Sequence, residues 1–326
     1  MTKMKKFLAV GLASVLAVSF AACSKGAGDS DTPSGTDAAA AKTGYSVISS
    51  ISEVKDTTLT IDSVCAAVLV DADGKIIDCK IDEAQTKPDL ATDNGNVSDL
   101  RTKLEKKEDY AMKSASPIQK EWYEQIAAFE AFAKGKTADE ITAAVGEDGM
   151  PTNADLKAGC TIHVGDIAKA VTNAIAGAQE LGASSTDTLK LAVSTEKYYE
   201  SNETNLQYDS NYAVVTLDAD GKITSCLIDA SQAKCTIADG KFTVAEGAFI
   251  TKKELKEDYN MKAASPIQKE WYEQAAAFEA FAKGKTAADL TAAVGENGMP
   301  ADADLKAGCT INVNSIVNNA VKAATV

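Results

Sequence analysis

The chain runs through one pattern of apolar and polar positions twice. Near residue 70, two apolar-rich runs flank a short polar stretch in CAAVLVDADGKIIDCKID. Asp73 and Gly74 at its centre are the residue types that a tight turn between two strands prefers. The same arrangement returns near residue 217 as VTLDADGKITSCLID. We therefore predict a β-hairpin in the first part of each copy.

A helical pattern follows each hairpin. In the first copy, Ser116 and Pro117 are predicted to open a helix as N-cap and first-turn residue, and Gly135 is predicted to close it. The apolar positions at helical spacing are Ile118, Trp122, Ile126, Phe129 and Phe132. One face of this helix is therefore expected to pack against the rest of the copy.

Two further helices complete each copy. Thr137 and Glu140 have the spacing of a capping box and predict a short helix that ends before Gly146. The loop GEDGMPTNADLKAGCT follows, and a last helix is predicted to begin near Asp166, or near Ser315 in the second copy. The predicted fold class is α+β, with two tandem homologous domains, each an antiparallel sheet with covering helices.

The two copies are long and nearly identical over much of their length. The stretches SPIQKEWYEQ and DLKAGCT occur in both of them. Copies of more than about 100 residues are domains and not units of a solenoid. The turn-rich stretch LGASSTDT, residues 181–188, is predicted to separate them. We place the domains at residues 45–183 and 184–326 and call them repeat 1 and repeat 2.

The N-terminus has the pattern of an export signal. Residues 1–22 begin with lysines and continue with FLAVGLASVLAVSFAA, which is short for a membrane span. The context of Cys23 resembles the lipobox of bacterial lipoproteins, whose cysteine carries lipid; a plain secretory signal is the alternative. Residues 23–44 are predicted to be a flexible tether. We expect the mature protein to be lipid-anchored at Cys23, on the outer face of the cytoplasmic membrane at the cell surface.

Composition argues against several classes of function. The formal net charge of −14 argues against binding to nucleic acid or to anionic lipid through charge. Seven cysteines are too few and too scattered for a disulfide scaffold. His163 is the only histidine, and Asn312 takes its place in repeat 2. No Cys/His cluster has the spacing of metal ligands, and no Ser-His-Asp set can be built in both repeats from one histidine.

The repeated stretch DLKAGCT is the strongest candidate for chemistry. It places Asp155, Gly159 and Thr161 in a surface loop just upstream of a predicted helix N-terminus, where backbone N–H groups favour an anion. The matching residues of repeat 2 are Asp304, Gly308 and Thr310. Aspartate and threonine in loops also serve as turn and cap residues, so spacing alone leaves this reading open.

The stretch resembles the flavinylation motif of the FMN-binding domain family, which runs Asp, two variable residues, Ser or Thr, Gly, Ala, Thr. The resemblance implies that a flavin transferase moves FMN from FAD onto Thr161 and Thr310 as a phosphodiester. The departures from the motif are Ala158 and Ala307 in place of the hydroxyl residue, and Cys160 and Cys309 in place of Ala. All four side chains are small, which leaves the threonines reachable.

The resemblance covers residues 45–326 and extends to the kind of protein. Tandem FMN-binding domains on a lipoprotein are similar to surface flavoproteins of Gram-positive extracellular electron transfer. The implied partners are a quinone-linked electron donor in the membrane and an extracellular electron acceptor. The protein is then an electron carrier, and a substrate of the flavin transferase, more than an enzyme in its own right.

Further residues are candidates for contact with the flavin, and each has an alternative structural role. The cysteines and methionines of the loop, and the tyrosines before the long helix, are Cys160, Cys309, Met150, Met299, Tyr110 and Tyr259. The two tryptophans, Trp122 and Trp271, are expected in the helix core before any role in flavin stacking.

Two other functions stay open at the sequence level. A solute-binding lipoprotein has a similar anchor and tether, but it normally places one ligand between two unlike lobes. A structural surface repeat explains the duplication without any ligand and predicts a colourless protein.

Overall fold

The computed structural model describes residues 38–244 and 247–325, which belong to one compact unit, Ala38–Val326. The export signal, Cys23 and most of the predicted tether lie outside the described residues. Among the described residues, no helix is long and apolar enough to cross a membrane.

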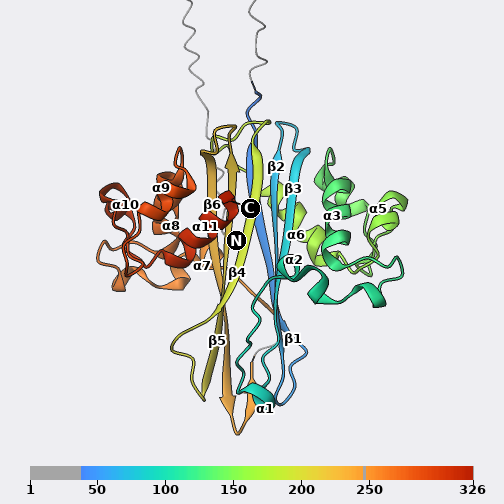
Figure 1. The fold of residues 1–326 in the computed structure, drawn as a ribbon, viewed down its shortest axis with the longest axis horizontal. Helices are drawn as coiled ribbons and strands as arrows, with labels where there is room; N and C mark the ends of the chain where they lie inside the picture. Colours follow the sequence, from blue (N-terminus) through green and yellow to red (C-terminus); the bar gives the residue numbers. More distant parts are fainter. Residues whose placement is uncertain (1–37, 245–246, 326) are drawn as a thin grey trace, which may run out of the picture. The chain divides into compact units, whose positions relative to one another are not determined.

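The described residues contain two antiparallel sheets of four strands each, with the strand orders β3-β2-β1-β8 and β4-β5-β6-β7 (Figure 1). The strands are β1 (Lys42–Ser52), β2 (Thr60–Val70), β3 (Ile76–Thr86), β4 (Thr188–Lys197), β5 (Asn205–Leu217), β6 (Ile223–Ala238), β7 (Lys241–Thr243) and β8 (Gly247–Phe249). The α+β class with antiparallel sheets is confirmed. β8 departs from the sequence order, because it belongs to repeat 2 and pairs with β1 of repeat 1.

Helices cover the outer side of each sheet (Figure 1). The helices of repeat 1 are α1 (Leu90–Asp93), α2 (Lys103–Lys106), α3 (Trp122–Ala133), α4 (Ala138–Ala143), α5 (Ala154–Gly159) and α6 (Gly165–Ala176). Those of repeat 2 are α7 (Lys252–Leu255), α8 (Trp271–Ala282), α9 (Ala287–Ala292), α10 (Ala303–Gly308) and α11 (Asn314–Thr325). Short 3₁₀ turns precede α3 and α8, at η1 (Lys107–Tyr110), η2 (Lys113–Ala115), η3 (Lys256–Tyr259) and η4 (Lys262–Ala264).

Strand β2 is apolar without interruption because both of its faces are buried. Successive side chains of a strand point to opposite faces. Val64, Ala66 and Val68 pack with the helices of repeat 1. Cys65, Ala67 and Leu69 pack against residues of the second sheet. Both faces are therefore buried, and the described residues form the layers helix, sheet, sheet and helix.

The predicted hairpin turns are confirmed. β2 and β3 pair in antiparallel register on either side of residues 71–75. The carboxylate of Asp71 accepts hydrogen bonds from the backbone of Asp73 and Lys75, both at 2.9 Å. Gly74 has φ +76°, a conformation that favours glycine. Gly221 repeats this geometry between β5 and β6 with φ +75°.

The two repeats share a core. Small and apolar side chains of both sheets meet at Ala41, Ala67, Leu69, Ala183, Leu189 and Val214. Hydrogen bonds cross this interface, among them one from Tyr45 to Asp229 at 2.7 Å and one between Thr43 and Ser225 at 2.8 Å. The predicted linker near residues 181–188 does fall between α6 and β4. Independent folding of each repeat stays a prediction, and this interface argues against it.

A second set of contacts joins the repeats at the other end of the sheets. Tyr208 of β5 is buried, and its hydroxyl donates to the carbonyl of Gly95 at 2.7 Å. The same hydroxyl accepts from the backbone N–H of Val97 at 2.9 Å. Gly95 and Val97 lie in repeat 1, between α1 and α2. A loop of one repeat therefore depends on a strand of the other for its backbone hydrogen bonds.

The predicted start of the long helix was wrong. α3 begins at Trp122, and Glu121 with Glu124 forms its capping box. Ser116 instead ends the 3₁₀ turn η2. Its buried hydroxyl accepts a hydrogen bond from the side chain of Gln125, so it serves the core and not a helix end. Gly135, with φ +78°, follows the last turn of α3, and the Thr137–Glu140 capping box opens α4; both were predicted.

Three further boundaries differ from the prediction. The tether ends earlier than residue 44, because Ala41 is buried and β1 starts at Lys42. Small residues are used here for close approach: a Cβ on Gly44 would lie 2.0 Å from the carbonyl oxygen of Ala174 in α6. The predicted loop contains a helix, α5 or α10, capped by Asn153 or Asp302. The last helices begin at Gly165 and Asn314, one residue before the predicted caps.

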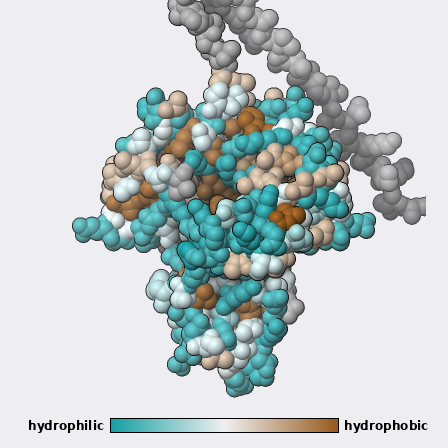
Figure 2. Space-filling model, turned by 45° about the vertical axis from the view of Figure 1, so that its right-hand side comes forward, coloured by the Kyte–Doolittle hydropathy of each residue, from teal (hydrophilic) through white to brown (hydrophobic). Residues whose placement is uncertain are grey.

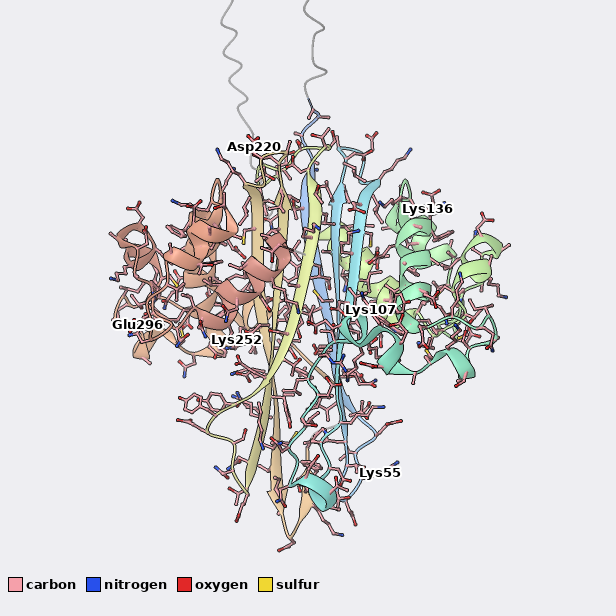
Figure 3. All side chains as sticks on the ribbon, viewed as in Figure 1. Lys55, Lys107, Lys136, Asp220, Lys252 and Glu296 are labelled. Atoms are coloured by element: carbon pink, nitrogen blue, oxygen red, sulfur yellow. The ribbon has the colours of Figure 1, made fainter. Side chains whose placement is uncertain are left out.

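The surface is mostly hydrophilic, with scattered apolar patches on the face that Figure 2 shows. Among the described residues, the large apolar side chains that are exposed are Leu104, Tyr199 and Ile250. Charged side chains project around both helical layers, as Lys107, Lys136 and Glu296 illustrate in Figure 3. Isolated exposed apolar residues are normal for a soluble surface, so attention turns to the cavities.

Candidate functional site

Thr161 is held by two hydrogen bonds to one buried side chain. Its backbone N–H donates to Oε1 of Gln125 at 2.8 Å, and its hydroxyl donates to the same oxygen at 3.2 Å. Thr310 makes both bonds to Gln274 at the same two distances. Each threonine is half-buried. The candidate threonines of the two repeats therefore have the same local geometry.

Gln125 is the residue that sequence reasoning missed. It lies on α3 and is fully buried, as Gln274 is on α8. Its side-chain NH₂ group donates to the hydroxyl of Ser116 and to the carbonyl of Lys120, both at 3.1 Å. All polar atoms of the amide are thus satisfied, which fixes its orientation. The signal that could have identified it is an amide residue on the apolar face of the helix, between Trp122 and Ile126.

Gly159 and Cys160 have structural roles at the end of α5. A Cβ on Gly159 would lie 2.6 Å from Cβ of Ala128, so only glycine lets α5 approach α3 this closely. Gly308 meets Ala277 in the same way. Cys160 and Cys309 are fully buried, and burial raises the pKa of both thiols, to about 11 for Cys309. These cysteines therefore belong to the core and not to an exposed reactive site.

Asp155 and Asp304 lie in the first turns of α5 and α10 and are exposed. None of the hydrogen bonds among the described residues joins either carboxylate to the threonine of the motif. The threonine hydroxyl is oriented by the glutamine instead. Met150 and Met299 are half-buried in the loop, and neither lines the cavities described next.

Each repeat has a cavity beside the residues that follow its threonine. Cavity 1, in repeat 1, has a volume of about 270 Å³. It is lined by Ile48, Ser50, Asp62, Val64, Glu83, Lys103, Tyr110, Met112, Trp122, Ile162, His163, Asp166 and Ile167. The cavity thus brings together the N-terminal ends of α3 and α6 and the outer face of the sheet. Of the predicted candidates, it includes Tyr110.

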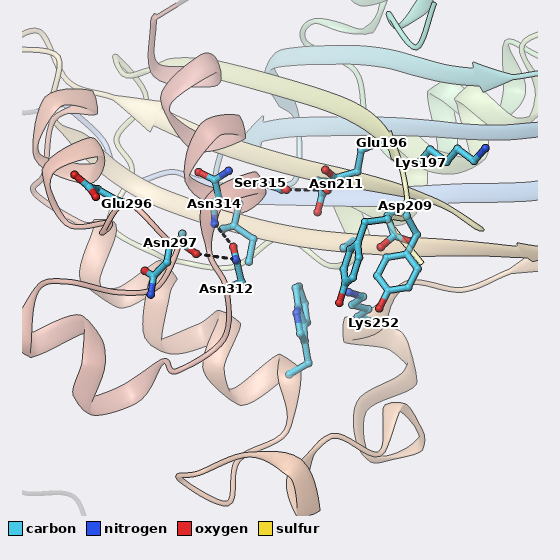
Figure 4. A pocket seen from close by; sticks show the side chains of 16 residues that line it. Glu196, Lys197, Asp209, Asn211, Lys252, Glu296, Asn297, Asn312, Asn314 and Ser315 are labelled. Carbon is cyan, nitrogen blue, oxygen red and sulfur yellow. Dashed lines mark hydrogen bonds between the residues drawn. The ribbon is translucent and has the colours of Figure 1, made fainter. Parts of the chain in front are cut away.

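Cavity 2 is the corresponding space in repeat 2, with a volume of about 580 Å³ (Figure 4). It is lined by Glu196, Lys197, Tyr198, Tyr199, Asp209, Asn211, Ala230, Lys252, Trp271, Glu296, Asn297, Gly298, Asn312, Asn314, Ser315 and Ile316. Four asparagines line this cavity and none lines cavity 1, where Val64 and His163 take the places of Asn211 and Asn312. Tyr259 does not line cavity 2, but its ring lies against Lys252, with 5.1 Å between Nζ and the ring centroid.

The tryptophans are core residues that also line the cavities. Trp122 and Trp271 are buried in the helix cores, at 3% and 4% exposure, which confirms the predicted packing. An edge of each also lines its cavity. A ligand in either cavity would therefore contact the small exposed part of an indole.

A lysine stands over the same two rings in both repeats. Nζ of Lys103 lies 5.1 Å from the centroid of Tyr110 and 5.7 Å from that of Trp122. Nζ of Lys252 lies 5.1 Å from Tyr259 and 5.5 Å from Trp271. These are distances at which an ammonium and a ring face attract each other.

The partner of this lysine differs between the repeats. Lys103 forms an ion pair of 2.6 Å with Glu83, and both side chains are only 10% exposed. Burial opposes the charge on Lys103, but Glu83 holds its pKa above the ordinary value. Burial raises the pKa of Glu83, and Lys103 opposes that rise; the short distance argues for two charged partners. Ala230 takes the place of Glu83 in repeat 2, so Lys252 lacks this partner.

Repeat 1 has two carboxyl groups with strongly raised pKa values, the buried Asp82 and the half-buried Glu130. Burial raises the pKa of Asp82 to about 7, although hydrogen bonds from Thr102, Glu83 and Leu104 oppose the rise. Burial also raises the pKa of Glu130 to about 7; its carboxylate accepts from the backbone N–H of Ile81 at 2.7 Å. These groups titrate near neutral pH and make the region sensitive to it.

No group of three or more potential metal ligands occurs within residues 38–244 and 247–325. The six cysteines in this part of the chain are all free and buried. No family model, curated protein or solved structure matches the chain. The proposals that follow therefore depend on the geometry of the site and on the resemblance of its loop.

Proposed function

We propose that each repeat carries one FMN, joined through its phosphate to Thr161 in repeat 1 and to Thr310 in repeat 2. The observation that carries this proposal is the pair of matching threonine–glutamine anchors, each followed within two residues by a residue that lines a cavity. Neither threonine lines the cavity itself. The two repeats are then homologous halves that each present one acceptor hydroxyl to a flavin transferase.

The anchor geometry is compatible with the chemistry. Transfer of FMN from FAD forms a bond between the threonine oxygen and phosphorus, breaks the pyrophosphate bond and releases AMP, and the hydroxyl gives up its proton. The hydrogen bond from the Thr161 hydroxyl to Gln125 is lost in this step. The bond from the Thr161 backbone to Gln125, at 2.8 Å, does not involve the hydroxyl and can persist. Gln125 would therefore hold the modified residue in place.

The cavities give the isoalloxazine ring a place to lie. Ligand sites are typically about 300–1,000 Å³ and mostly apolar, with a few polar groups that fix orientation. The volume of cavity 2 falls in this range, and that of cavity 1, at about 270 Å³, lies just below it. The four asparagines and the charged side chains make cavity 2 more polar than a typical site. Bound flavin supplies reversible redox chemistry, and the chain supplies the tryptophan, the lysine and the covalent anchor.

Covalent attachment has a physical advantage outside a cell. A noncovalent ligand with a Kd near ~1 μM and an association rate near ~10⁶ M⁻¹s⁻¹ leaves its site in about a second. Released flavin would diffuse away. We therefore propose a lipid-anchored electron carrier at the outer face of the membrane, between a quinone-linked donor and an extracellular acceptor. Cys23 and the tether would supply the anchor.

Mass spectrometry after co-expression with a flavin transferase tests the proposal. We expect two FMN masses on the intact chain, one after Thr161→Ala and one after Thr310→Ala. Thr161→Ser should keep some labelling because it keeps a hydroxyl, whereas Thr161→Val keeps the shape and should lose the label. Thr172→Val, at a half-buried threonine of α6, is the matched control and should keep both.

The glutamine anchor can be tested in the same assay. Gln125→Leu removes the acceptor of both Thr161 hydrogen bonds and should lower labelling of repeat 1 while repeat 2 keeps its flavin. Unmodified threonines in the wild-type chain, under conditions that flavinylate another acceptor domain, would contradict covalent attachment.

A further inference from the structure

Lys252 is a half-buried cation without a hydrogen bond or ion pair to any described residue. Its ammonium group lies over the rings of Tyr259 and Trp271, and no described residue supplies a hydrogen-bond acceptor for it. Lys103 reaches the same position in repeat 1 but is neutralised there by Glu83 at 2.6 Å. One substitution, Ala230 for Glu83, separates the two arrangements.

The carboxylates of cavity 2 have other partners. Glu196 accepts from the hydroxyl of Ser315 at 2.7 Å and from the amide of Asn211 at 3.3 Å (Figure 4). Asp209 accepts from two glutamine side chains, Gln207 and Gln232, at 2.6 and 3.3 Å. Glu296 is exposed and lies at the far end of the cavity from Lys252 (Figures 3 and 4).

The charge count favours an anion in cavity 2 over cavity 1. Cavity 2 is lined by three carboxylates and two lysines, and cavity 1 by three carboxylates and one lysine that is already paired. Cavity 2 also has about twice the volume. Its asparagines can orient a ligand, since no described residue bonds the side chain of Asn314 or the NH₂ group of Asn297.

We propose that cavity 2 is a binding site for a planar ring compound that carries a negative charge, with the ring against Trp271 and the charge beside Lys252. Cavity 1 does not share this preference, because Glu83 occupies the position of the anion. The residue at this position, Glu83 in repeat 1 and Ala230 in repeat 2, decides whether the cavity accepts an anion. This inference goes beyond the attachment of FMN and does not require it.

Equilibrium dialysis of the intact chain, purified without flavin, tests the inference with two probes of matched shape. The probes are 2-naphthoate, which is an anion, and 2-naphthamide, which is neutral. We expect one site for naphthoate and affinity about tenfold weaker for naphthamide, the effect of one half-buried charge pair. Equal affinity for the two probes, or no binding of either, would overturn the inference.

Three variants locate the charge. Ala230→Glu reproduces the Glu83–Lys103 ion pair of repeat 1, where a glutamate fits beside the lysine. It should weaken the affinity for naphthoate about tenfold and leave the affinity for naphthamide unchanged. Lys252→Met should have the same effect and keeps the test valid if Ala230→Glu does not fold. Lys55→Met, at an exposed lysine that lines neither cavity, is the control and should leave naphthoate binding intact. Undiminished naphthoate binding by Lys252→Met, or an equal loss in Lys55→Met, would place the charge elsewhere and overturn the proposal.

The result is independent of flavinylation. A chain that takes no FMN on its threonines can still bind naphthoate at cavity 2, so failure of the proposed function leaves this test unaffected. A chain that accepts FMN on co-expression but shows no preference for the anionic probe when purified without flavin would uphold the proposed function and reject the inference.

Discussion

Repeat 1 and repeat 2 hold a lysine over the same pair of rings and give it opposite surroundings. In repeat 1 the cation is neutralised by Glu83, and the next residue, Leu104, is an exposed apolar side chain. In repeat 2 Ala230 leaves Lys252 without that partner. The following residue is Lys253, which pairs with Glu279.

Two copies of one fold can therefore differ in the charged residues at a site while the local geometry around it stays the same. The anchors of Thr161 and Thr310 have the same distances, and so nearly do the lysine–ring contacts. The pairing of the cations has changed, and asparagines have replaced Val64 and His163. The difference between the repeats is therefore one of charge and polarity, and it lies where a ligand would be bound.

The largest expected effect comes from separating the repeats. Residues 184–326 expressed alone would expose apolar side chains such as Leu189 and Val214 and leave β8 without β1. We expect no cooperative unfolding transition for this fragment as a monomer. Circular dichroism in urea, with the molecular mass measured in parallel, checks this. A monomeric fragment that unfolds cooperatively would restore the sequence-based prediction of independent domains.

Removing the same lysine from each repeat should have unequal costs. Lys103→Met leaves Glu83 buried without a partner, which typically costs about 3–5 kcal/mol. Lys252→Met breaks no ion pair and should change the free energy of unfolding by less than about 1 kcal/mol. Urea denaturation at neutral pH measures both, and equal costs would show that the Glu83–Lys103 pair is not the distinguishing feature.

The buried carboxyl groups of repeat 1 predict a dependence on pH. Asp82 has a folded pKa of about 7 and releases its proton near 3.8 when unfolded, so between these values the folded state binds more protons. The free energy of unfolding should therefore fall as pH rises from about 4 to about 7 and level off above. At about 1.4 kcal/mol per pKa unit, Asp82 contributes at most about 4 kcal/mol to this fall.

Two variants sharpen this prediction. Asp82→Asn should flatten the dependence, since the group no longer titrates. Leu104→Lys copies Lys253 of repeat 2 and should lower the pKa of Glu130, which also flattens it in part. Urea midpoints at pH 4.5, 6 and 8 are the measurement. Stability that rises over this range in the wild-type chain would contradict the assignment.

The smallest expected effect concerns flavin bound as proposed. The uncompensated Lys252 should favour the reduced, anionic ring in repeat 2 and give it a higher reduction potential than repeat 1. A tenfold preference corresponds to about 30 mV for a two-electron couple. Spectroelectrochemistry of Thr161→Ala and Thr310→Ala isolates each flavin. Ala230→Glu should lower the potential of repeat 2, and an unchanged value would contradict the comparison.

Local elements were predictable wherever the interactions that stabilise them lie within a short stretch of sequence. The turn at Asp73 and Gly74 requires a positive φ, and the Thr137–Glu140 box satisfies backbone donors within four residues. The long helix was placed five residues early, because Ser116 has the chemistry of a cap but serves as a buried partner of Gln125. A cap signal in the sequence does not show which donor it will meet.

By itself the sequence determined the repeat, the α+β class, the turns and the two candidate threonines. Only the tertiary structure decided that Gln125 holds Thr161, that β8 pairs across to repeat 1, and that Glu83 reaches Lys103. Those contacts join residues far apart in the chain or in different repeats, and their energies depend on burial and distance. No pattern of neighbouring residues encodes either quantity, so the charge difference between the two cavities could be seen only in the fold.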